Sequence, residues 1–393
     1  MEIRRAVETY REELIALRRD FHAYPELGFR EFRTAEKVET YLQSLGLETE
    51  RIAGTGVAAM LDGRRKDGAV LLLRADMDAL PIQEENTFAF ASMHPGVMHA
   101  CGHDAHMAMM LIAAKILTEM ADELEGRIKF VFQPNEEIAG AQLMIDEGVL
   151  EDPHVDASLA LHIWSPIESG KVGIKAGPVT ASMDVFSVTI SGRGGHTGYP
   201  ESAVDPVIAA ANVIQQVQQI QTRLISPMNA TAIMFGKVQG GSKNNIIPDE
   251  VVLEGTIRYL YAAGPGDLHN PTERFRKLVT DICTVHGCGC TFDIQHENDA
   301  VVNHPTMTSM AFDVAKEMLG ESCITEHASM ACEDFSAFCD QVPSVLVFLG
   351  TAREEAGSTY PHHNPKFTID EATLTTGVEL LVRGAMRYFE RYS

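Results

Sequence analysis

The chain has 393 residues, of which 45% are hydrophobic and 22% charged, a composition typical of a globular protein with room for two domains. Acidic residues outnumber basic ones by 55 to 32, and the formal net charge is −23. Because nucleic acids and anionic membranes attract a basic surface, neither is an expected partner. The acidity is interpreted as a feature that keeps the protein in solution.

The segment Met1–His22 is expected to form a charged amphipathic helix rather than the apolar part of a signal peptide. No run approaches the roughly 18 apolar residues of a membrane span. Seven cysteines without an export signal favour a reducing cytoplasm. Cys283, Cys288 and Cys290 form a C-x4-C-x-C cluster that suggests a structural zinc. No further ligand pair with zinc-finger spacing follows, so buried free thiols are the preferred interpretation.

The first part of the chain alternates between helical periodicity and short apolar runs. In chain order we predict a helix at 30–45, strands at 54–61 and 69–73, a helix at 106–120, a strand at 127–132, a helix at 141–146 and a strand at 157–163. This alternation predicts an α/β domain with helices on both faces of a mixed sheet.

The middle of the chain has a different order of elements. The pattern predicts strands and helices in the order β-α-β-β-α-β, at 184–191, 203–220, 231–238, 251–260, 271–284 and 290–295. This order is typical of a ferredoxin-like α+β unit. The chain then returns to α/β, with a helix at 305–319, a strand at 344–349 and a helix at 371–388. We therefore expect a domain formed by residues 1–179 and 296–393, interrupted by an inserted domain at 180–295.

The densest group of potential metal ligands is HACGHDAH, which covers residues 99–106. It lies in a loop between a predicted strand and a long helix, and such loops bind ligands in open α/β sheets. The thiolate of Cys101 and the imidazole of His103 are good ligands for zinc and similar metals. His99 and His106 are expected to pack or to hydrogen-bond around these ligands.

Three further groups follow, two of them at the same kind of place. Glu136 and Glu137 follow the predicted strand at 127–132, where one carboxylate can bind a metal while the other accepts a proton from water. His162 stands at the end of the strand at 157–163, and His362 and His363 occupy a proline-bounded loop before the last helix. Together these groups supply enough nitrogen, oxygen and sulfur atoms for two metal ions.

Asp76 and Asp78 follow the apolar run VLLL. A carboxylate at this point can hold a ligating histidine in the required tautomer. The same residues are equally consistent with a simple turn that ends the strand.

These motifs resemble the M20 metallopeptidase superfamily, in its N-acyl-amino-acid amidohydrolase branch, which includes hippurate hydrolases, plant indole-acetyl-amino-acid hydrolases and aminobenzoyl-glutamate hydrolase. The resemblance runs from about His22 to Tyr388. It is carried in order by RADMDALPIQEE, MHACGHDAHMAM, FQPNEE, LHIW, SGRGGHTGYPESAVDP, NNIIPDEVVLEGTIR, EDFSAF and HHNPKFTIDE. It implies a catalytic domain with two divalent metal ions and a ferredoxin-like lid that mediates dimerisation.

The resemblance also implies roles for individual residues. Glu136 matches the general base, and Asp78 the acidic residue that supports a metal ligand. The ions, which would be manganese or zinc with cobalt or nickel as alternatives, would be bound by Cys101, His103, Glu137, His162 and His363. His363 is chosen over His362 because the family pattern is histidine, a small residue and then proline.

In the inserted domain, His196 matches a histidine that stabilises the developing oxyanion at a neighbouring active site. Asn245 and Arg258 match positions that bind the substrate carboxylate, although Arg258 is equally readable as a surface strand residue. Glu333 matches a pocket position. The chain departs from the family at Cys332, where a small residue is usual, and in having Asn135 before the two glutamates.

The activity implied is hydrolysis of an N-acyl or N-aroyl amino acid by a cytoplasmic homodimer or higher oligomer. Three other interpretations stay open at this point. The chain could be a dipeptidase or carboxypeptidase of the same superfamily, or a non-catalytic metal-binding descendant of it. A thiol hydrolase that uses Cys101 with His103 is also chemically conceivable.

Overall fold

The computed structural model describes residues 2–264, 266–267 and 269–392. The chain folds into two compact units. The first unit consists of three segments: the chain up to Val179, the segment Val301–Ala328, and the chain from Glu333 onward. The second consists of Thr180–Ala300 and Ser329–Cys332. It extends past residue 295 because strand β13 (Gly289–Asn298) continues beyond that point.

Within the described residues, the first unit contains an eight-stranded sheet in the order β1-β2-β4-β3-β5-β16-β6-β15. Strands β4, β3, β5 and β16 run parallel, whereas β1 and β2 pair antiparallel at one edge. The predicted mixed sheet is therefore confirmed. The strands are β1 (Thr49–Ile52), β2 (Gly56–Asp62), β3 (Val70–Asp76), β4 (Arg127–Gln133), β5 (Ala157–Glu168), β6 (Val172–Gly173), β15 (Ile324–Thr325) and β16 (Ser344–Ala352).

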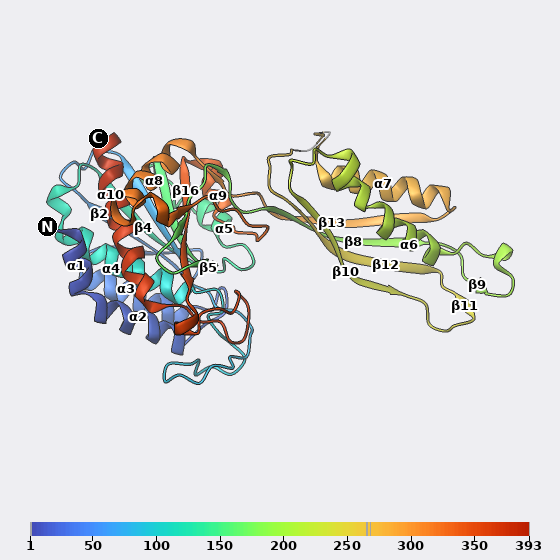
Figure 1. The fold of residues 1–393 in the computed structure, drawn as a ribbon, viewed down its shortest axis with the longest axis horizontal. Helices are drawn as coiled ribbons and strands as arrows, with labels where there is room; N and C mark the ends of the chain where they lie inside the picture. The colour runs from blue at the N-terminus through green and yellow to red at the C-terminus, as the bar shows by residue number, and fades with distance from the viewer. Residues whose placement is uncertain (1, 265, 268, 393) are drawn as a thin grey trace. The chain divides into compact units, whose positions relative to one another are not determined.

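Helices cover both faces of this sheet (Figure 1), as the alternating sequence pattern predicts. The expected N-terminal helix is two helices, because Tyr10 leaves the helical conformation at φ −96° and ψ 9°. The helices are α1 (Ile3–Thr9), α2 (Arg11–Ala23), α3 (Phe32–Ser44), α4 (His103–Glu119), α5 (Ala141–Asp146), α8 (Pro305–Leu319), α9 (Ser336–Gln341) and α10 (Leu374–Tyr392). None of the helices in the described residues is long and apolar enough to cross a bilayer.

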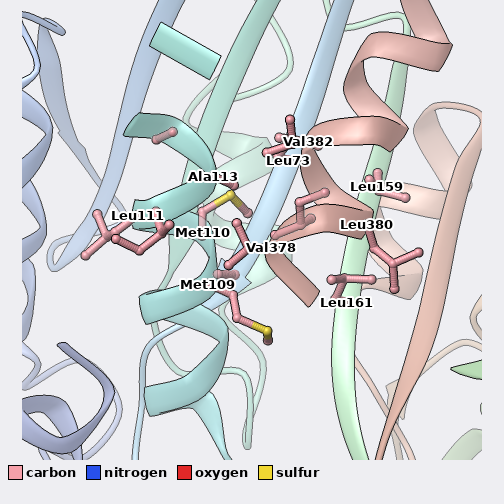
Figure 2. Close-up of a cluster of buried hydrophobic side chains, with 14 of the residues drawn as sticks. Leu73, Met109, Met110, Leu111, Ala113, Leu159, Leu161, Val378, Leu380 and Val382 are labelled. Carbon is pink, nitrogen blue, oxygen red and sulfur yellow. The ribbon is translucent and has the colours of Figure 1, made fainter. Parts of the chain in front are cut away.

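The main core lies between this sheet and the helices α4 and α10. Figure 2 shows Leu73 of β3 and Leu161 of β5 beside Met109 of α4 and Val378 of α10. Every residue of β3 is buried, which is typical of a strand at the centre of a parallel sheet. Helix α4 is apolar on nearly all sides because it is enclosed by the core. The loop that precedes α4 is therefore anchored to the buried core of the unit.

The second unit contains, in the part of the chain that the structure describes, an antiparallel sheet in the order β10-β12-β8-β13 with helices α6 and α7 packed against it. This order and its β-α-β-β-α-β sequence are those of a ferredoxin-like fold. Its elements are β8 (Ser182–Ser191), α6 (Pro206–Gln216), β10 (Thr231–Gly240), β12 (Glu250–Tyr259), α7 (Pro271–Val285) and β13. A small pair, β9 (Gly195–His196) and β11 (Ile246–Ile247), extends it.

Helix α6 begins three residues later than predicted. Asp205 caps it by accepting a hydrogen bond from the main-chain N–H of Val207 at 2.8 Å. The residue before it, Val204, is bridged to Arg193 instead of joining the helix. A capping aspartate followed by proline is a common helix start, so the sequence Asp205-Pro206 indicates the observed start of α6.

Candidate metal centre

The parallel strands of the first unit bring three sets of polar residues to one edge of the sheet. Asp76 ends β3, and Glu136 and Glu137 follow the end of β4. His162 lies inside β5, which continues past the predicted end at residue 163 to Glu168. The carboxyl ends of parallel strands are where ligands bind in open α/β sheets, and these side chains converge there.

Gly102 shapes the loop that carries Cys101 and His103. It adopts a left-handed conformation at φ 91°, and a Cβ atom there would collide with Ile163. This turn directs Cys101 and His103 into the same space. The Cys101 Sγ lies 3.7 Å from Nε2 of His162.

Asp78 fixes the orientation of His103. The Nδ1–H of His103 donates to the main-chain oxygen of Asp78 at 2.9 Å and lies 3.2 Å from its carboxylate. Nε2 is therefore the nitrogen with a lone pair, and it is buried without a hydrogen-bond partner in the described residues. A buried unpartnered nitrogen of this kind fits a metal ligand whose tautomer is set by a neighbouring carboxylate.

Asp78 also holds the two glutamates. Its carboxylate oxygens accept the main-chain N–H groups of Glu136 at 3.0 Å and Glu137 at 3.1 Å. Oε1 of Glu137 is buried without a hydrogen bond among the described residues and lies 3.4 Å from Nε2 of His363. The ligand atoms of Cys101, His103 and Glu137 lie within 4.8 Å of one another.

The two remaining histidines near the centre are already hydrogen-bonded. Nδ1 of His106 lies 2.6 Å from the carboxylate of Asp76, and its Nε2 accepts the N–H of Ile163 at 2.9 Å. Nε2 of His362 accepts the N–H of Ser165 at 3.1 Å. These contacts confirm the expectation for His106, and they leave His363 as the histidine of the pair that faces Glu137.

His99 is buried, and within the described part of the chain neither of its ring nitrogens has a hydrogen-bond partner. Burial lowers its pKa to about 4, so it is neutral at pH 7. It packs in the core as the sequence pattern suggested.

The electrostatics of the centre favour a cation. Burial raises the pKa of the Cys101 thiol well above its usual value, and the charge of Glu137 raises it further. Burial and then Glu333 likewise raise the pKa of Glu136. Burial alone would lower the pKa of His103, but the charge of Asp76 and its other acidic neighbours raise it to about 10. A divalent cation would displace these protons and offset the repulsion among the carboxylates.

A buried cluster around Arg74 was not predicted. Arg74 is 1% exposed, and its guanidinium contacts Asp76 at 2.6 Å, Glu333 at 2.8 Å and Asp334 at 3.0 Å. Glu333, expected in a substrate pocket, is 3% exposed and held by this ion pair. The sequence signal was present, because a charged residue within the apolar run VLLLRAD has to be paired when the strand is buried.

The second unit presents its candidate residues differently. His196 and Asn245 are exposed, and both line a shallow hollow of about 500 Å3 with Lys243 and Asp249. The main-chain N–H of Gly198 donates to Nδ1 of His196 at 2.9 Å. These side chains are accessible within their own unit.

Arg258 is half-buried and donates from its guanidinium to the main-chain oxygen of Met330 at 2.9 Å. Near it in the same unit, Cys332 accepts a hydrogen bond from the side chain of Asn298 at 3.3 Å. The predicted role of Arg258 in binding a carboxylate stays a prediction.

The cysteine cluster of the second unit consists of free thiols, of which Cys283 and Cys288 are buried and Cys290 is partly exposed. Burial raises the pKa of Cys283 to about 12. Within the described residues, these cysteines are not part of any group close enough to hold an ion. The three residues are thus free thiols as predicted, with Cys283 and Cys288 buried and Cys290 not fully so.

Comparison with known proteins gives consistent matches. Residues 72–387 match the model of peptidase family M20/M25/M40. An N-acyl-L-amino acid amidohydrolase of Geobacillus stearothermophilus is 41% identical, over 77% of this chain and 81% of that protein. Thermostable carboxypeptidase 1 of Saccharolobus solfataricus is 36% identical, over 93% and 92%. A crystal structure from Bacillus subtilis, described as a dinuclear metal-binding M20 peptidase, superposes with a TM-score of 0.84 and 33% identity, over 98% and 99% of the two chains.

Proposed function

The chain belongs to peptidase family M20/M25/M40 and is a metal-dependent amidohydrolase, and we propose that it hydrolyses N-acyl or N-aroyl amino acids. The observation that carries this proposal is the convergence, at one sheet edge, of the Cys101 thiol with Nε2 of His103 and Oε1 of Glu137, two buried atoms without a hydrogen-bond partner in the described residues. The mixture of these atoms suits zinc or manganese, and also cobalt or nickel. Two ions would be held by Cys101, His103, Glu137, His162 and His363.

When bound, such ions lower the pKa of water toward about 7 and polarise the scissile carbonyl. Glu136 accepts the proton of the attacking water and later delivers it to the nitrogen of the leaving amine. Asp78 keeps His103 in the Nδ1–H tautomer and fixes the main chain of both glutamates. The oxygen of water bonds to the amide carbon and the C–N bond breaks. The products are a carboxylic acid and a free amino acid.

We assign the second unit to substrate handling. His196 would donate a hydrogen bond to the developing oxyanion, and its exposure leaves it accessible for that purpose. Asn245 and Arg258 would bind the substrate carboxylate. In the first unit, Glu333 would lie at the substrate pocket, and its position close to Glu136, where Arg74 holds it, supports this role. The ferredoxin-like unit would serve as a lid and as the dimerisation surface of a homodimer.

We also propose that the protein acts in the cytoplasm. Cys101, Cys283, Cys288 and Cys290 are free thiols, which fits a reducing compartment.

The proposal is tested by an activity panel. The metal-free protein is loaded separately with manganese, zinc, cobalt or nickel and offered acetyl-, benzoyl-, indole-acetyl- and aminobenzoyl-amino acids. We expect release of the free amino acid from at least one of these substrates, and loss of activity with a chelator. Activity that survives complete metal removal would instead indicate a thiol hydrolase based on Cys101, since that chemistry requires no metal.

A carboxypeptidase is the second candidate, because a relative with 36% identity carries that name. Unblocked dipeptides and N-blocked peptides included in the same panel separate the two activities. A higher kcat/KM for peptides than for every N-acyl amino acid would favour the carboxypeptidase.

A further inference from the structure

The loop between β4 and α5 carries both Glu136 and Glu137, and its conformation is strained. Asn135 lies in the left-handed region at φ 54°. Gly140 approaches Pro134 so closely that a Cβ atom would collide with the main-chain oxygen of Pro134. Strained loops persist only where the surrounding structure holds them, so contacts from outside the loop have to define its shape.

Asp334 makes contacts at both ends of this loop. Its Oδ2 accepts the main-chain N–H groups of Gly140 and Ala141, each at 2.9 Å, where α5 begins. Both of its oxygens lie 2.8 Å from the side-chain Nε2 of Gln133, the last residue of β4. One carboxylate, itself 2% exposed, therefore connects the residue that enters the loop with the residues that leave it.

Arg74 closes a ring with these two side chains. Its Nε donates to Oε1 of Gln133 at 2.8 Å, and its guanidinium lies 3.0 Å from Oδ1 of Asp334. The Gln133 amide thus accepts from Arg74 and donates to Asp334, which fixes its orientation. A buried carboxylate with a charged partner and several donors is held in one position, because each lost contact would leave a buried group unpaired.

We propose that Asp334 is a positioning residue for hydrolysis, which sets the placement of Glu136 and Glu137 by fixing both ends of their loop. Asp78 holds the middle of the loop, through the main-chain N–H groups of the two glutamates. Asp334 and Asp78 together therefore hold the loop at its two ends and in its middle. The inference rests on the proposed roles of Glu136 as base and Glu137 as ligand.

The first test is Asp334→Asn. Asparagine keeps the size of the side chain. Its NH2 group, however, would face N–H donors of the main chain and of Gln133 that in the wild type donate to a carboxylate oxygen of Asp334. We expect kcat to fall by about 10- to 100-fold, with KM altered much less. This is the range typical of substitutions of residues that hydrogen-bond to a metal ligand. The visible spectrum of the cobalt-loaded protein should change, because Glu137 would bind the ion in a different position.

The matched control is Glu379→Gln. Glu379 is also buried and charged in the first unit, where it contacts Arg4 and Arg383 outside the centre. It should lose stability without a change in kcat or in the cobalt spectrum. If Asp334→Asn does not fold, Gln133→Met breaks the same ring without leaving a charge unpaired, and we expect it to lower kcat by a smaller factor.

Hydrogen exchange provides a readout that needs neither substrate nor metal. Amides in a peptide covering residues 134–146 should exchange faster in the Asp334→Asn or Gln133→Met variant than in Glu379→Gln. The proposal is overturned if exchange in that peptide and the cobalt spectrum both match the wild type. Absence of any N-acyl amino acid hydrolysis by the wild type would instead refute the proposed function, since the exchange result stands without it.

Discussion

The two units of the molecule hold their candidate functional residues in opposite ways. In the first unit most of the side chains, with the exception of the exposed His363, are buried or nearly so and held by hydrogen bonds, as Asp78 is to His103 and to the loop of Glu136. In the second unit His196 and Asn245 are exposed. A metal centre needs dehydrated donors in fixed positions, whereas groups that meet a substrate have to stay accessible. Substitution of a metal ligand in the first unit should therefore disturb metal binding, whereas substitution of His196 or Asn245 in the second should affect turnover alone.

The largest expected effect is that of Glu136→Gln. Loss of the general base should reduce kcat by up to about 10,000-fold, while the bound metal measured by elemental analysis stays at the wild-type level. Glu137→Gln, one residue further, is the matched comparison and should lose metal. Metal loss in Glu136→Gln would remove that residue from the role of base.

The second unit is tested by His196→Ala. Removal of one oxyanion donor typically lowers kcat by about 100- to 1,000-fold. Because the side chain is exposed, the midpoint of thermal unfolding and the metal content should not change. A variant with wild-type kcat would show that His196 takes no part in the reaction, and a variant with lowered metal content would contradict the contrast between the units.

Cys101→Ala should weaken metal binding by on the order of 100-fold. A direct ligand contributes at least as much to metal affinity as the residues that hydrogen-bond to the ligands. Elemental analysis after gel filtration measures the loss. Cys283→Ala removes a buried thiol in the second unit and should retain all metal. Equal metal content in the two variants would exclude Cys101 from the ligand set.

The smallest expected effect concerns His296 in the second unit. Hydrogen bonds to Asp184 and Asp299 raise its pKa to about 10. Because the folded state binds this proton more tightly than the unfolded chain, the stabilisation is complete below about pH 6.5 and is lost as the pH rises through about 10. His296→Gln should lower the thermal midpoint by a degree or two at about pH 6 and by nothing above about pH 10.5. A constant difference across this range would contradict the ion pair.

Much of the fold follows from local sequence patterns. Helices α5 and α8 were predicted to the residue, and α8 begins at Pro305, where proline is favoured in the first turn. The break at Tyr10 was missed because the helical periodicity continues across it. Such a break depends on tertiary packing, which a local pattern does not contain.

In the site, too, features set by local sequence could be predicted, and features set by tertiary packing could not. Cys101, His103 and the two glutamates are recognisable because ligand-type residues follow predicted strands. The ring that includes Arg74 and Asp334 was missed because its members lie 260 positions apart in sequence. The position of Arg74 in an apolar run indicates a buried charge, but the sequence alone does not identify the acidic residue that pairs with it in the folded chain.

Trp164 is the only tryptophan in the sequence, and it lies two residues after His162. Its indole packs against the ring of His362, with centroids 4.8 Å apart, and against His162 at 5.4 Å. All of the intrinsic indole fluorescence of the protein therefore originates beside the candidate metal centre. Quenching of this emission during a titration with a paramagnetic ion would report occupancy of the centre directly, without a label and without a substrate.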